Sequence, residues 1–149
     1  MLNTVVDVLN YVTNGLKTKC TGYLFVNSFP EKLTEFPISK PTVSVGISKA
    51  DIPFSECTYL GTNTSNVKYY GAVADCSVAL KICVPKSSSG IKCYQAFDSI
   101  ANACLSLNGV DVVDLSCGNI VYDRIMGALV LSAEIRLKAE LLNTIASST

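Results

Sequence analysis

Apolar residues alternate with polar residues in three segments of the chain, a period typical of strands that bury one face. The segments are 42–48, 72–84 and 129–141. The alternation is most regular from Leu129 to Leu141, where nearly every intervening residue is charged or polar. In the first segment, Thr42 and Ser44 are expected on the solvent side, opposite the apolar residues. We predict a half-buried strand at each segment.

Two other segments place apolar residues three or four positions apart, which predicts amphipathic helices. The first covers residues 3–16, with Gly15 near its end as a stop signal. The second covers residues 91–107 and is followed by Asn108 and Gly109, residue types that tolerate positive φ and are expected to close the helix.

The remaining segments are less periodic. Residues 20–27 form a short β-prone run, and residues 110–123 are expected to be β structure of undetermined register. Between this run and the strand at 42–48, Pro30, Pro37 and Pro41 favour an extended edge or connection. Residues 53–71 are glycine- and asparagine-containing and predict a long loop or an extended hairpin.

The order of these elements defines the expected fold class. Consecutive strands without intervening helices pair antiparallel, because a parallel pair needs a long crossover connection. We therefore predict an α+β protein: a single mainly antiparallel β-sheet with two helices packed on it. No linker or internal repeat divides the sequence, so residues 1–149 are expected to form one domain.

The composition of the chain argues against some classes of function and favours others. Twelve Lys and Arg balance twelve Asp and Glu, only 16% of residues are charged, and the mean hydropathy is +0.37. Without a basic excess, the chain lacks the electrostatic signature of nucleic-acid binding. A neutral, charge-poor surface also favours association, so we expect other subunits to cover part of it.

The residues for catalysis or metal binding are sparse. The chain has no histidine, the commonest general base and zinc ligand. Its seven cysteines contain no C-x-x-C pair, which argues against a zinc ribbon or a redox motif. Buried, reduced thiols are the expected state, and a thiolate activated by a nearby lysine is the alternative. We predict no catalytic residue, cofactor or metal site, and therefore no enzyme.

Two polar groupings have alternative interpretations. Asp111 and Asp114 lie three residues apart in a β segment, so we expect them on opposite faces, where they are solvated ends of the strand. The segment from Ser87 to Gly90 precedes the second helix. Its backbone N–H groups suit an anion, but helix capping by serine is the favoured role.

Two sets of residues are candidates for subunit or tube contacts. The first is the polar face of the last strand, whose mixed charges suit either solvent or a complementary neighbour; its members are Glu134, Arg136, Lys138 and Glu140. The second is a group of large apolar side chains in the loop at 53–71, which follow no strand or helix period; they are Phe54, Tyr59, Leu60, Tyr69 and Tyr70. Aromatic side chains of this kind are common interface anchors.

Three ordered segments resemble a known family. They are FPEKLTEFPISKPTVSVGI at 29–47, YYGAVADCSVALKICVPKSSSGIKCYQAFDSIANACL at 69–105, and LSCGNIVYDRIMGALVLSAEIRLKAEL at 115–141, after a short leading helix. Together they resemble the tail terminator (tail completion) proteins of contractile phages and phage-tail-like bacteriocin particles. The resemblance covers most of the chain, and the seven cysteines depart from the family's pattern without a role that we can assign.

The resemblance implies a structural protein without catalytic residues. Such proteins form a ring, typically a hexamer, on the end of the tail tube; the ring ends tube and sheath polymerisation and offers a head-joining or capping surface. The implied partners are further copies of the chain, the tube and sheath proteins and a head–tail connector. Another tail or connector component is the alternative, and a small-molecule-binding or enzymatic α+β domain is a more distant one.

The sequence also predicts where the protein is made. Residues 1–17 have no basic start and carry Asp7 within their apolar stretch, unlike a signal peptide. No apolar run reaches the roughly 20 residues of a membrane helix. We expect synthesis in a bacterial cytoplasm, no membrane partner and incorporation into a virion or tail-like particle.

Overall fold

The computed structural model describes residues 2–27, 39–53, 58–62, 64–65 and 68–143; the side chains of residues 58–61, 68–70 and 142–143 lie outside this description. The elements are α1 (Val5–Lys19), β1 (Leu24–Asn27), β2 (Thr42–Asp51), β3 (Thr58–Thr62), β4 (Lys68–Pro85), α2 (Ile91–Cys104), β5 (Asp111–Asp123) and β6 (Ala128–Asn143).

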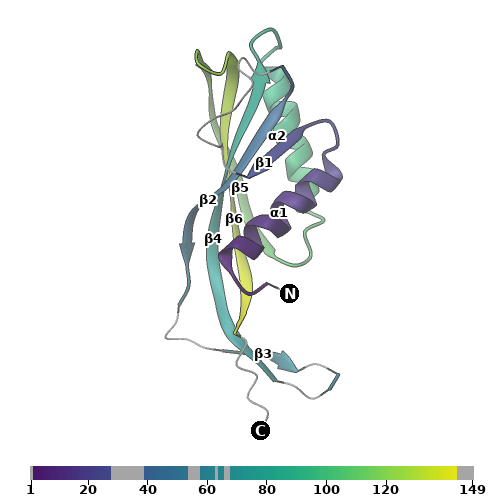
Figure 1. Ribbon diagram of the computed structural model, residues 1–149, viewed down its shortest axis with the longest axis vertical. Helices are drawn as coiled ribbons and strands as arrows, with labels where there is room; N and C mark the ends of the chain where they lie inside the picture. Colours follow the sequence, from purple (N-terminus) through teal and green to yellow (C-terminus); the bar gives the residue numbers. More distant parts are fainter. Residues whose placement is uncertain (1, 28–38, 54–57, 63, 66–67, 144–149) are drawn as a thin grey trace.

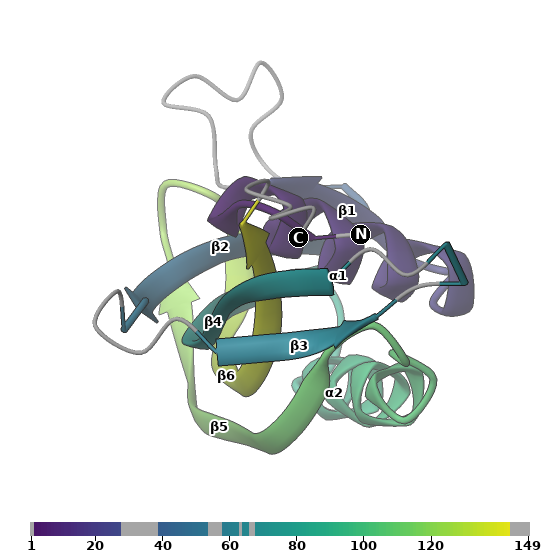
Figure 2. The same ribbon diagram turned by 90° about the horizontal axis from the view of Figure 1, so that it is seen from below.

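The strands form one six-stranded sheet in the order β1-β2-β4-β6-β5, with β3 paired to β4 off this path. The β1–β2 pair is parallel and the other pairs are antiparallel. Both helices pack on the same face of the curved sheet (Figures 1 and 2), which we call the inner face; the opposite side is the outer face. The predicted α+β class, a mainly antiparallel sheet with two helices on it, is confirmed.

The centre of the sheet is the long antiparallel pair of β4 and β6. Its register runs without interruption from Tyr70 opposite Asn143 to Pro85 opposite Ala128. The alternation predicted for these strands is confirmed, because every second residue of β4 from Ala72 to Val84 is apolar and buried on the inner face.

β2 and β3 follow one another along the same edge of β4. β2 pairs with residues 75–83 of β4, and β3 pairs with residues 68–71. Of the two structures expected for residues 53–71, the extended hairpin is the one adopted by the described backbone at 58–62 and 68–71. Figure 1 shows this β3–β4 hairpin at one end of the long axis, beyond both helices.

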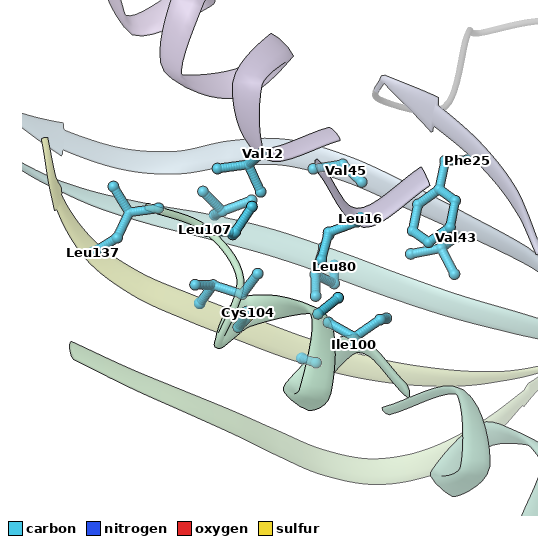
Figure 3. Packing of buried hydrophobic residues seen from close by; sticks show 14 of the residues in the cluster. Val12, Leu16, Phe25, Val43, Val45, Leu80, Ile100, Cys104, Leu107 and Leu137 are labelled. Carbon is cyan, nitrogen blue, oxygen red and sulfur yellow. The ribbon is translucent and has the colours of Figure 1, made fainter. Parts of the chain in front are cut away.

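The core lies between the inner face and the helices (Figure 3). Val12 and Leu16 of α1 meet side chains of β2 and β4, while Ile100 and Cys104 of α2 approach Leu80. α1 begins with a capping box, in which the Thr4 hydroxyl accepts from the Asp7 N–H and the Asp7 carboxylate accepts from the Thr4 N–H. These bonds and the one from the Asn3 N–H hold the pKa of Asp7 below its ordinary value.

Gly15 does not end the first helix, contrary to the prediction. α1 continues to Lys19, and Cys20 caps it with a backbone bond to Leu16. A Cβ atom at Gly15 would overlap the side chain of Leu107, which is part of the core. The glycine therefore permits close packing between α1 and the chain that follows α2. It is explained by tertiary packing and not by the end of a helix.

The predicted end of the second helix is also wrong. α2 ends at Cys104, and three tighter i→i+3 bonds carry the chain on to Leu107. Gly109 lies beyond this turn and its φ is not positive. At the other end, the N-cap is Gly90 without a side-chain bond, and the Ser89 hydroxyl accepts from the Ile91 N–H at 3.3 Å.

The outer face is partly covered at one end. Thr42 and Ser44 are buried, so β2 is buried on both faces at its start, unlike the half-buried strand predicted there. Nearby on the outer face, Cys83 forms a small apolar cluster with Ala128 and Val130, against which Met126 packs. The turn between β5 and β6 thus covers the end of the outer face.

Candidate assembly surface

Away from that cluster, the outer face is polar and no helix of the described chain covers it. Arg136, Lys138 and Glu140 of β6 are exposed on it, and Glu134 is partly buried. These are the four residues that the sequence selects as a mixed-charge strand face. The structure places them on one side of the central strand, as their spacing predicts.

Neighbouring strands extend the charges into rows across the sheet. Lys138 lies between Asp75 of β4 and Asp111 of β5, and Arg136 lies opposite Asp114. The Arg136 Nη1 and Asp114 Oδ2 atoms are 3.9 Å apart, and the two side chains are 60% and 52% exposed. Because water screens such a pair, it stabilises the fold little and is available for exchange with a partner's charges.

Asp111 and Asp114 lie on the same face, which corrects the expectation that they point in opposite directions. The register of β5 against β6 shifts between Val112 and Asp114. The inserted residue, Val113, is a β-bulge that changes the alternation by one position. As a result, both aspartates are exposed on the outer face beside the cations of β6.

The charged rows continue onto β2. Lys49 and Asp51 pair with Ser77 and Asp75 of β4, and the Lys49 Nζ and Asp51 Oδ2 atoms are 3.4 Å apart. These residues and the cations of β6 line a shallow hollow of about 370 Å³. Charges of both signs alternate across it, so the hollow suits a surface of complementary pattern better than a single small ion.

A second hollow lies where β5 begins. β5 pairs with β6 only up to Lys138, while β6 continues for five more residues to Asn143. Val73, Lys138 and Glu140 line a space of about 460 Å³ at this step, together with the connection from Asn108 to Asp111. The apolar wall at Val73 and the flanking charges form a recess within the polar face.

The aromatic candidates belong to the projecting hairpin. Tyr59 of β3 pairs with Tyr70 of β4, Gly61 pairs with Tyr69, and Leu60 is the additional residue in β3 where the register shifts. Phe54 lies outside the described residues. The hairpin brings the backbones of the other four together at the end of the molecule, while Glu134 to Glu140 lie along the middle of the sheet.

Sequence reasoning missed an apolar group at the other end of the molecule. Val121, Tyr122 and Ile125 are exposed at and beside the β5–β6 turn. The Asp123 carboxylate accepts from the N–H groups of Ile125 and Met126, and Gly127 completes the turn with a φ of 56°. The apolar residues of this asparagine- and glycine-containing segment are visible in the sequence. They follow no strand or helix period, however, so the sequence does not show which of them are exposed and which are buried.

The described thiols are free, and five of the six are buried. Burial raises the pKa of Cys83 to about 12, although nearby Lys81 lowers it, and burial raises the pKa of Cys104 to about 11. Protonated thiols are poor nucleophiles, so these cysteines act as small apolar side chains. Cys117 is exposed on β5, and Cys57 lies outside the described residues.

The described residues contain no group of three or more Cys, Asp and Glu arranged to hold a metal ion. Within the same part of the chain, no helix is long and apolar enough to cross a bilayer.

Comparisons with known proteins show a likeness of fold. No family model matches the sequence, and no curated protein matches it. Among solved structures, the chain is similar to the sheath/tube terminator of an extracellular contractile injection system, PVC, in its extended state. The identity is 12% and the TM-score is 0.51 over 100% of this chain. The chain spans 61% of the length of that protein.

Proposed function

We propose that this chain is a non-enzymatic structural subunit of a contractile tail-like particle. In this proposal, six copies form a ring on the end of the tail tube, stop the polymerisation of tube and sheath, and provide the surface that joins a head or caps a headless particle. The observation that supports it best is the likeness in fold, along the whole chain, to a sheath/tube terminator. The ordered sequence segments that resemble tail terminators are independent support.

The outer face supports the same function. It is a broad surface with charges of both signs, and such surfaces fix the register of a protein partner more than they bind small ligands. We assign Glu134, Arg136, Lys138 and Glu140 to contacts within the assembled tail end. The proposed partners are the tube and sheath proteins and, where a head is present, its connector. Synthesis in the bacterial cytoplasm precedes incorporation into the particle.

The test is to assemble tube and sheath proteins of the same particle with and without this chain and to measure tail lengths by electron microscopy. Tails of uniform length are expected with the chain and overlong tubes without it. Arg136→Glu with Lys138→Glu should abolish length control, whereas Lys86→Glu with Lys92→Glu, an equal charge change away from the outer face, should not. Uniform tails in the absence of the chain would contradict the proposal.

A further inference from the structure

We draw no further inference here: the strongest candidate, the exposed apolar patch of Val121, Tyr122 and Ile125 at and beside the β5–β6 turn, carries none because nothing in the structure shows what covers it.

Discussion

The hydroxyl of Tyr11 accepts a hydrogen bond of 2.7 Å from the backbone N–H of Gly109. The two residues are 98 positions apart, and the bond joins α1 to the connection between α2 and β5. A Cβ atom at position 109 would lie 2.8 Å from Tyr11 Cζ. Gly109 is therefore required by the close approach of a side chain, and the bond fixes the start of β5 relative to the helices.

Tyr11→Phe should lower the free energy of unfolding by about 0.5–1.5 kcal/mol, the usual contribution of one hydrogen bond. Gly109→Ala should lower it further, because the new methyl group displaces the Tyr11 ring. Urea unfolding measures both. Tyr94→Phe, at an exposed position on α2, is the control and should change stability by less than about 0.5 kcal/mol. An equal effect of both tyrosine changes would contradict the role of the bond.

Gly15→Ala should destabilise the protein, although the same change inside an ordinary helix stabilises it by about 1 kcal/mol. The reason is the overlap with Leu107 Cδ2, because this buried side chain must then shift within the core. In a Leu107→Ala background the same substitution should become stabilising, since the space is then free. Gly22→Ala is the control, because no atom lies within 4 Å of the added Cβ. Stabilisation by Gly15→Ala alone would disprove this packing.

The buried thiols predict a loss of stability in alkali. The folded pKa of Cys83 is about 12 and that of Cys104 about 11, above the ordinary value of 9.0. Between pH 9 and 11 the unfolded chain loses thiol protons that the folded chain retains, so unfolding becomes more favourable as pH rises. Urea midpoints should fall across this range, and Cys83→Ala should reduce the slope. A midpoint independent of pH would contradict the assignment.

Strong reductant and chelator should leave the thermal midpoint unchanged within about 2 °C, because the described thiols are free and contribute by packing. Scanning calorimetry with each reagent measures this. A large decrease in reductant would indicate a disulfide, and one in chelator would indicate a bound metal.

Tyr59→Ala with Leu60→Ala should leave the stability of the isolated protein within about 1 kcal/mol, as surface changes usually do. It should nevertheless impair tail completion, because we expect the β3–β4 hairpin to contact other tail components. Ile91→Ala with Tyr94→Ala, on the exposed side of α2, is the matched control and should assemble normally. Unfolding of the hairpin variant, or tails of normal length, would count against this role.

The sequence predicts the helices and the two central strands, because the spacing of apolar residues in such elements follows from which of their faces is buried. The alternation from Leu129 to Leu141 and the apolar face from Ala72 to Val84 both correspond to strands of the sheet. The helical periods also identify α1 and α2.

The errors arise where distant segments impose the local structure. Glycine is typical of helix ends, and the sequence therefore suggested that role for Gly15 and Gly109. In the structure, both glycines instead allow a close approach, by Leu107 to Gly15 and by Tyr11 to Gly109. The bulge at Val113 depends on the register with β6, and it alone brings Asp111 and Asp114 onto one face. For the candidate surface, the polar face of β6 was predictable, but the charges added by β2, β4 and β5 required the strand order.

The uninterrupted pairing of β4 with β6 has a mechanical consequence. β6 has 16 residues, all paired with β4, so the ladder is about 50 Å long. This ladder has no bulge that could act as a hinge. It is therefore expected to transmit a force from the β3–β4 hairpin to the β5–β6 turn at its far end. We therefore expect a displacement of the hairpin to be transmitted along this ladder to the far end and to tilt the outer face between them.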